Sequence, residues 1–245
     1  MKRQNKQDIW KHALVLFGML FALIITSCAV APDMQVQAAQ NVNVTYKKAD
    51  GSKKCKGKST INVKHYYKRA VLEGSSDAVK KINSYLKKKS DAFMKEKSGA
   101  IMQAQDDVAM GMYDKETYED YVSSKVTYND KNVISIKITQ QWYAGGVSSK
   151  TIYGYTFSLK SGKLLKLTDV CNGSASQIKK KLVAKIKKGA DAADIDFKVV
   201  NAYKTSKYQF YLKPGKKAVV CFPPYEIGFG GDSRCYTIQD RKSVV

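Results

Sequence analysis

The spacing of the apolar residues changes period at Tyr118, and this change constrains the possible fold more than any other feature of the chain. Beyond Tyr118, mostly apolar side chains occupy alternate positions over residues 122–128, 134–138 and 153–159. Alternation with a period of two predicts strands that bury one face. Turn-forming residues at 129–132 separate the first two runs, so we expect a series of antiparallel strands.

Two other segments have the helical period. The first begins at Ser75 or Ser76 with Asp77 in its first turn, and the second is capped by Ser174 or Ser176. Their apolar faces comprise Val79, Ile82, Leu86 and Phe93 in the first helix and Ile178, Leu182 and Ile186 in the second. The remaining elements are expected as a Met-rich helix at 100–112 and as strands at 41–47, 59–72, 208–212, 218–222 and 234–239.

This order of elements predicts an α+β fold in which antiparallel sheets pack against amphipathic helices. We expect two associated subdomains after a signal peptide. Their expected bounds are 1–39 for the signal peptide, 40–117 for an N-terminal strand–helix domain and 118–245 for a C-terminal β-rich domain.

The first forty residues predict export from the cytoplasm. Basic residues precede an apolar run at 13–30, and Ala38 ends a small-x-small cleavage pattern. Two alternatives stay open: lipidation at Cys28, which ends a passable lipobox, and retention of the apolar run as a membrane anchor. All three place the rest of the chain outside the cytoplasm, either secreted or at the cell surface.

The charge of the chain predicts partners of opposite sign. There are 43 Lys and Arg against 21 Asp and Glu, a formal net charge of +22. For an exported protein this favours an anionic wall polymer over nucleic acid, although the charge can also serve solubility alone. The densest basic patch is expected on the second helix and comprises Lys179, Lys180, Lys181, Lys185, Lys187 and Lys188. It would face either an anionic surface or solvent.

Four cysteines follow the expected cleavage site, and an even number outside the cell permits two disulfides. We favour Cys221 with Cys235, because they lie near the facing ends of two strands joined by one loop. Cys55 with Cys171 is then the remaining pair. The alternative is four reduced thiols.

Residue types suitable for catalysis are sparse, so we expect no enzyme, no metal and no cofactor. His65 is the one histidine after the signal segment, and no nucleophile elbow accompanies it. Asp169 and Glu226 are the carboxylates that a glycan-cleaving enzyme would use. We instead expect Asp169 to cap a turn or helix and Glu226 to bind loop backbone.

Two glycine-rich loops carry the candidate binding residues. If both loops meet at one end of a sheet, their aromatic side chains would form a platform for a sugar or a peptide; otherwise they close the core and set strand register. The candidate residues are Trp142, Tyr143, Gly145, Gly146, Tyr225, Glu226 and Phe229.

The same loops resemble a known family. The resemblance lies in residues 141–146 (QWYAGG), 153–159, 161–163, 167–170 (LTDV) and 222–228 (FPPYEIG) with Gly230 and Gly231. These segments resemble the extracytoplasmic domain of the lysozyme-sensing anti-sigma-V factors (RsiV). The upstream half resembles the domain that precedes it there, and the same pair occurs beside peptidoglycan deacetylase domains of the PdaC type.

The resemblance implies an exported sensor or binding domain of largely unknown function. We expect no sigma-binding segment and no deacetylase domain in this chain. The family's histidine after the double glycine is replaced by Val147 and Ser148. Lysozymes are commonly basic, so the net charge disfavours lysozyme as a partner. We therefore expect a non-catalytic module that binds an anionic wall polymer or a secreted protein, with a glycan-acting enzyme or a lysozyme-binding decoy as alternatives.

Overall fold

The computed structural model describes residues 42–95, 97–112, 117–215 and 217–239. The expected signal peptide, its cleavage site and Cys28 lie outside these residues. Within them, no helix combines the length and the apolar character needed to cross a bilayer.

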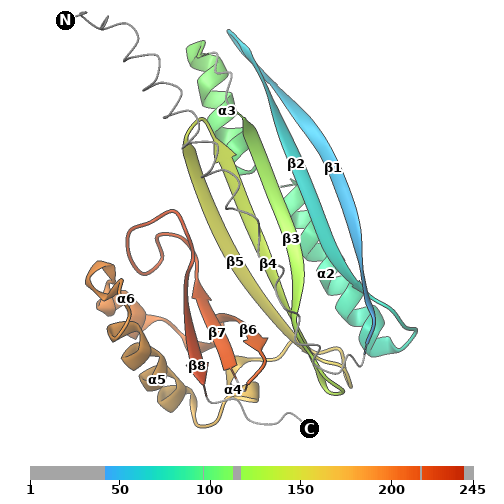
Figure 1. The fold of residues 1–245 in the computed structure, drawn as a ribbon, viewed down its shortest axis with the longest axis vertical. Helices are drawn as coiled ribbons and strands as arrows, with labels where there is room; N and C mark the ends of the chain where they lie inside the picture. The colour runs from blue at the N-terminus through green and yellow to red at the C-terminus, as the bar shows by residue number, and fades with distance from the viewer. Residues whose placement is uncertain (1–41, 96, 113–116, 216, 240–245) are drawn as a thin grey trace, which may run out of the picture. The chain divides into compact units, whose positions relative to one another are not determined.

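Five long strands form the larger sheet, in the order β1-β2-β3-β4-β5 (Figure 1). Their bounds are Val44–Lys56 for β1, Thr60–Leu72 for β2, Tyr118–Asn129 for β3, Val133–Ala144 for β4 and Val147–Ser158 for β5. Adjacent strands are antiparallel except β2 and β3, which are parallel. The alternating pattern beyond Tyr118 therefore corresponds to strands, as predicted.

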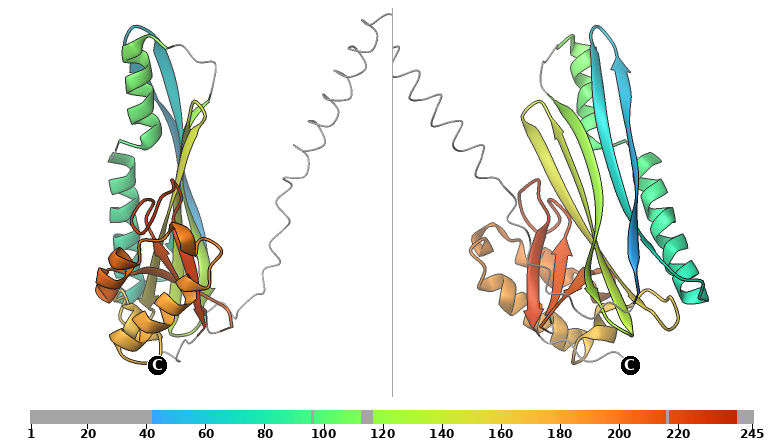
Figure 2. Two further views of the ribbon diagram at one scale, coloured as in Figure 1. Left: turned by 90° about the vertical axis from the view of Figure 1, so that its left-hand side faces the viewer. Right: turned by 45° about the vertical axis from the view of Figure 1, so that its right-hand side comes forward.

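Helices α2 (Asp77–Lys95) and α3 (Gly99–Met110) follow one another along one face of this sheet (Figure 2). The apolar face of α2 packs on alternate residues of β4, among them Ile134 and Ile136. Ser98 starts α3 by accepting a hydrogen bond of 3.2 Å from the N–H of Ile101. Both helices, including the Met-rich one, match the sequence-based expectation.

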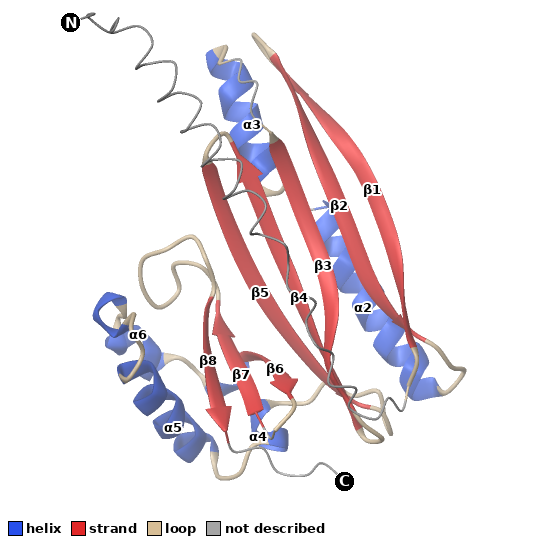
Figure 3. Cartoon of the chain, viewed as in Figure 1, coloured by secondary structure: helices blue, strands red, loops and turns tan. Residues whose placement is uncertain are grey.

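The smaller sheet has the order β6-β7-β8 and lies beside helices α5 and α6 (Figure 3). The bounds here are Leu167–Val170 for α4, Ala175–Lys187 for α5, Phe197–Ala202 for α6, Gln209–Lys213 for β6, Lys217–Phe222 for β7 and Arg234–Gln239 for β8, with 3-10 turns at Ala192–Asp194 and Thr205–Lys207. Ile178, Leu182 and Ile186 of α5 are buried with alternate residues of all three strands. The other face of this sheet packs against β5.

Contact between the two sheets depends on Gly154. A Cβ at this position would lie 2.1 Å from the backbone of Phe210, so only glycine lets β6 cross so close to β5. Nearby, the N–H of Leu212 donates to Ser135 Oγ at 2.8 Å. This buried hydrogen bond joins the two sheets at a place where their strands are not paired with each other.

The architecture is α+β, as predicted, with one correction: the larger sheet contains a parallel pair. Helices α2 and α3 connect β2 to β3, and such a crossover returns the chain in the same direction. Because β2 and β3 are neighbours, the sheet also crosses the expected boundary between residues 117 and 118.

Candidate functional site

The lysines of α5 project from the protein because three apolar residues point inward. Ile178, Leu182 and Ile186 are all 1% exposed or less. Ser174 and Gln177 begin the helix with a reciprocal pair of hydrogen bonds, of 3.3 Å to Ser174 Oγ and 2.8 Å to Gln177 Oε1. With this apolar face buried, the helical spacing of the lysines divides them between two sides of α5.

On one side, a groove of about 690 Å³ lies between α5 and the residues at the ends of β6 and β8 and the start of β7. Lys181 and Lys185 of α5 line it together with Lys213 and Lys217, which lie directly opposite each other in the β6–β7 hairpin. The other lining residues are Thr237, Ile238 and Gln239. Among the described residues the lining therefore holds four lysines and no carboxylate, and we name these four the lysine groove.

On the other side of α5, a groove of about 460 Å³ faces α6. Lys179, Lys180 and Lys187 line it. Lys179 donates to the backbone oxygens of Asn201 and Tyr203, the latter at 3.1 Å, and so satisfies carbonyls at the end of α6.

The expected single basic patch is thus wrong in one respect. Lys179 serves the packing of α6, Lys180 and Lys187 line the groove on that side, and Lys181 and Lys185 line the other groove. Lys188 is the C-cap residue of α5. Lys213 and Lys217 were missed, although Pro214 and Gly215 between them are a recognisable turn signal.

A disulfide joins Cys221 and Cys235, the pairing favoured from the sequence. The two residues are direct partners in the β7–β8 ladder, and the bond closes the loop of residues 222–234. The second expected pair is not formed. Cys55 is buried against α3, whereas Cys171 follows α4 in the core beneath α5. The sequence pairing by elimination failed because these two residues belong to separate cores.

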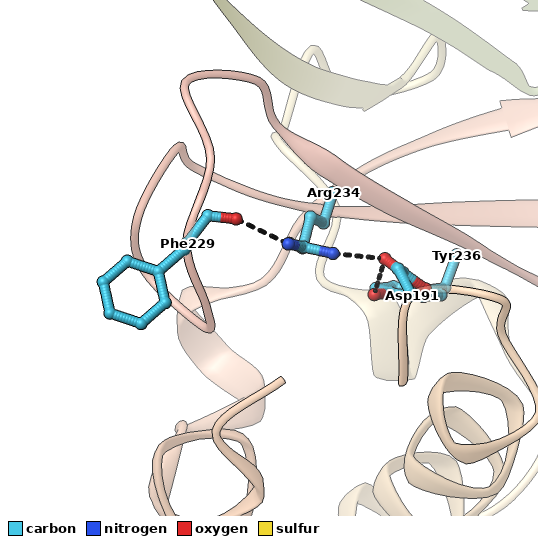
Figure 4. Close-up of polar contacts among 4 residues, drawn as sticks. All are labelled: Asp191, Phe229, Arg234 and Tyr236. Carbon is cyan, nitrogen blue, oxygen red and sulfur yellow. Dashed lines mark hydrogen bonds and ion pairs between the residues drawn. The ribbon is translucent and has the colours of Figure 1, made fainter. Parts of the chain in front are cut away.

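The loop at 223–233 is held at its base by Arg234 (Figure 4). This guanidinium donates to Asp191 Oδ2 at 2.7 Å and to the backbone oxygen of Phe229 at 2.5 Å. Tyr236 donates to the same carboxylate oxygen at 2.8 Å. Burial alone would raise the pKa of Asp191, but the hydrogen bonds from Tyr236 and Arg234 outweigh it and the pKa is lowered.

The loop at 223–233 contacts residues 148–150 at the start of β5, next to the turn formed by Gly145 and Gly146. The N–H of Lys150 donates to the carbonyl of Gly231 at 3.0 Å, and the Lys150 ammonium pairs with Asp232. Gly145 and Gly146 form the β4–β5 turn with φ of 52° and 88°. In the other loop, Tyr225 has a positive φ of 61°, and Tyr225 and Phe229 are 70% and 87% exposed.

The expected aromatic platform is nevertheless not formed as predicted. Trp142 packs against α3, where a Cβ on Gly99 would lie 2.1 Å from the indole. Tyr143 follows it in β4 and therefore points to the opposite face of the sheet. Tyr121 and Tyr66 lie on that opposite face and were not identified from the sequence.

The candidate catalytic residues have structural contacts. Asp169 accepts a hydrogen bond of 2.8 Å from the N–H of Lys166 and caps α4, as expected. His65 packs on the ring of Tyr67. Glu226 lies close enough to Tyr203 to add to the effect of burial in raising the tyrosine's pKa. The described residues contain no group of three His, Cys, Asp or Glu placed to hold a metal ion.

Comparisons with known proteins agree with this architecture. Residues 58–150 match the family model described as deacetylase PdaC. No curated protein matches the chain. A DUF3298 family member from Bacteroides fragilis has a similar structure, with a TM-score of 0.54 and 14% identity over 84% of this chain and 96% of that one.

A DUF3298 family protein from Pseudomonas aeruginosa is also similar, with a TM-score of 0.47 and 12% identity over 80% of this chain and 91% of the other. At 14% identity the Bacteroides fragilis likeness shows the fold alone. The chain thus carries a PdaC-like segment at residues 58–150 and has the α+β fold of a DUF3298 protein.

Proposed function

We propose that the protein is an exported, non-catalytic module of the cell envelope that binds an anionic wall polymer in the lysine groove. The observation that carries this proposal is the convergence of Lys181, Lys185, Lys213 and Lys217 from separate elements on one groove. Export itself rests on the N-terminal pattern of the sequence, and the product would be secreted or held at the cell surface.

Electrostatics supports a polyanion as the ligand. Like charges gathered around one groove repel each other, and an anionic group placed between them relieves this repulsion. The chain's net charge of +22 adds a long-range attraction for polyanions. Ammonium groups act as point charges with no fixed directionality, so they suit a flexible chain of phosphates or carboxylates.

The test is retention of the purified protein on cell walls with and without teichoic acids. Lys213→Gln with Lys217→Gln should weaken binding about tenfold and reduce its salt dependence, because two charges leave the groove. Lys53→Gln with Lys54→Gln on β1 removes the same charge from exposed positions elsewhere and serves as the matched control. Equal losses in both variants would point to net charge alone.

A secreted protein is the second candidate ligand, and the loop at 223–233 is the observation that favours it. Exposed aromatic side chains on a restrained loop are typical anchors at protein interfaces. Tyr225 and Phe229 have this arrangement. The resemblance to the anti-sigma-V ectodomain would make lysozyme such a ligand. Lysozymes are commonly basic, so the positive net charge of this protein would repel them.

Retention of the protein on immobilised lysozyme distinguishes a protein ligand from an anionic polymer. Retention that is lost in a Tyr225→Ala, Phe229→Ala variant but kept in the lysine-groove variant supports the protein ligand. For the enzymatic alternative, release of sugar from walls that disappears with Asp169→Asn or Glu226→Gln would be required.

A further inference from the structure

The face of the larger sheet opposite α2 and α3 is only partly covered. The smaller sheet covers it where Ile152, Gly154 and Ser135 contact β6 and β7. Toward the β4–β5 turn, the same face carries exposed side chains, among them Tyr121 and Tyr143 at 38% and 36% exposure. We name this region the open sheet face.

Strand register arranges its side chains in rows. One row runs from Tyr66 through Tyr121 to Gln141 on three adjacent strands. The next row runs from Lys64 through Glu119 to Tyr143. Directly paired residues lie on the same side of a sheet, so each row presents a line of side chains across the strands.

The aromatic rings are ordered within these rows. The rings of Tyr66 and Tyr121 stack with centroids 4.9 Å apart and planes 15° from parallel. The hydroxyl of Tyr121 donates to the carboxylate of Glu119. This bond orients the Tyr121 ring.

The surroundings of the rings carry both charges, with lysines in excess, because Asp50 lies directly opposite Tyr66 on β1 and Glu119 lies beside Tyr121. Lys64 and Lys68 are exposed on β2, and the Lys68 ammonium lies 4.3 Å above the ring of Tyr46. Lys48 lies directly opposite Lys68 on β1. The open sheet face therefore combines aromatic rings, an amide, the ammonium groups of Lys48, Lys64 and Lys68, and the carboxylates of Asp50 and Glu119.

We propose that the open sheet face binds an acidic polysaccharide lying across the strands. The outer faces of the stacked Tyr66 and Tyr121 rings and the exposed ring of Tyr143 would pack against the apolar faces of sugar rings, while ammonium groups pair with the sugar carboxylates. Neighbouring strands are about 4.8 Å apart, comparable with the length of one pyranose unit, so successive sugars would meet successive strands. This site shares no residue with the lysine groove and does not depend on it.

Titration of the full chain with two acidic probes and one neutral probe tests the proposal. The probes are hyaluronan decasaccharides, oligogalacturonates and chitohexaose, followed by calorimetry and by amide chemical shifts of β2, β3 and β4. Binding of an acidic probe is expected, with shifts confined to these strands. Tyr66→Leu with Tyr121→Leu should weaken it about tenfold, because two stacking surfaces are lost.

The controls distinguish this site from the proposed polymer site. Tyr66→Phe keeps the ring and should bind within about twofold of wild type. Lys213→Gln with Lys217→Gln should leave glycan binding unchanged while weakening retention on walls. Thermal melts verify that each variant is folded.

Three results would overturn the proposal: binding of neither acidic probe, binding of the neutral probe alone, or loss in the lysine-groove variant with none in the tyrosine variant. If the Leu variant does not fold, Lys64→Gln with Lys68→Gln replaces it, and unchanged binding of the acidic probes there counts against the proposal.

Discussion

Tyr67 donates a hydrogen bond of 2.8 Å to Oδ2 of Asp120 beneath the helix-covered face of the larger sheet. Asp120 is 1% exposed, and its other oxygen has no hydrogen-bond partner among the described residues. Burial raises the pKa of the Asp120 carboxyl, and the opposing effects of Tyr67 and His65 are smaller. The folded protein therefore holds the proton of this carboxyl more tightly than the unfolded chain does.

Stability should consequently fall as this carboxyl ionises. The stability that the protonated Asp120 contributes is fully present below about pH 4, which is the pKa of an aspartate in an unfolded chain. This stability is lost as the pH rises through the higher pKa of Asp120 in the folded protein. Asp120→Asn keeps an acceptor for Tyr67 without the charge, so its melting temperature should decline less over this range. Melting curves at a series of pH values check this. The exposed Asp106→Asn is the control, and a wild-type pH profile in Asp120→Asn would contradict the interpretation.

Reduction of the Cys221–Cys235 disulfide should destabilise the protein. The two cysteines are 14 residues apart, and closing a loop of this size stabilises a fold by about 3 kcal/mol in the chain-entropy model. Denaturation with and without reductant measures the difference. Cys221→Ser with Cys235→Ser should show the same loss and no further response to reductant, whereas a response equal to that of wild type would assign the effect to other thiols.

Gly154→Ala should be among the most damaging single-methyl changes. The added Cβ would press on the backbone of β6, which cannot move without separating the sheets, and overpacking of this kind costs about 1–3 kcal/mol. Gly146→Ala offers a contrast, since it has no atom within 4 Å and only its φ of 88° opposes alanine. Urea unfolding compares them, and a larger loss at Gly146 would contradict the close approach of the sheets.

Arg234→Ala should loosen the loop at 223–233 more than it lowers global stability. It removes the contacts to Asp191 and to the Phe229 carbonyl together. Faster amide exchange is expected in this loop, with little change in β2 to β4. Lys80→Gln, which removes an exposed ion pair with Asp77, should leave loop exchange unchanged. Unchanged exchange in Arg234→Ala would mean that the disulfide and the Lys150 contacts suffice.

Much of the fold could be predicted because it depends on local periodicity. The apolar faces of α2 and α5 and the alternation in β3 to β5 are each contained in short segments. The Cys221–Cys235 pair was also accessible, since both residues flank one loop. Contacts between residues distant in the sequence could not be predicted in this way. Local sequence does not indicate that β2 pairs with β3, nor that Cys55 and Cys171 lie in separate cores.

The candidate site was harder to predict because it combines distant segments. Lys181 and Lys185 were identified, but their partners Lys213 and Lys217 come from a hairpin outside the helix. The error at Trp142 and Tyr143 was avoidable, since consecutive residues of a strand face opposite ways. Tyr66 and Tyr121 become neighbours only through the parallel pairing of β2 with β3.

That parallel pairing also determines the sequence of events during synthesis. When only residues 44–110 have emerged, β2 still lacks the neighbour that will satisfy one of its edges, and the apolar faces of α2 and α3 still lack β4. An unpaired edge flanked by exposed apolar surface invites association with other chains. The first half of this chain therefore keeps an unpaired strand edge until the second half is available to cover it.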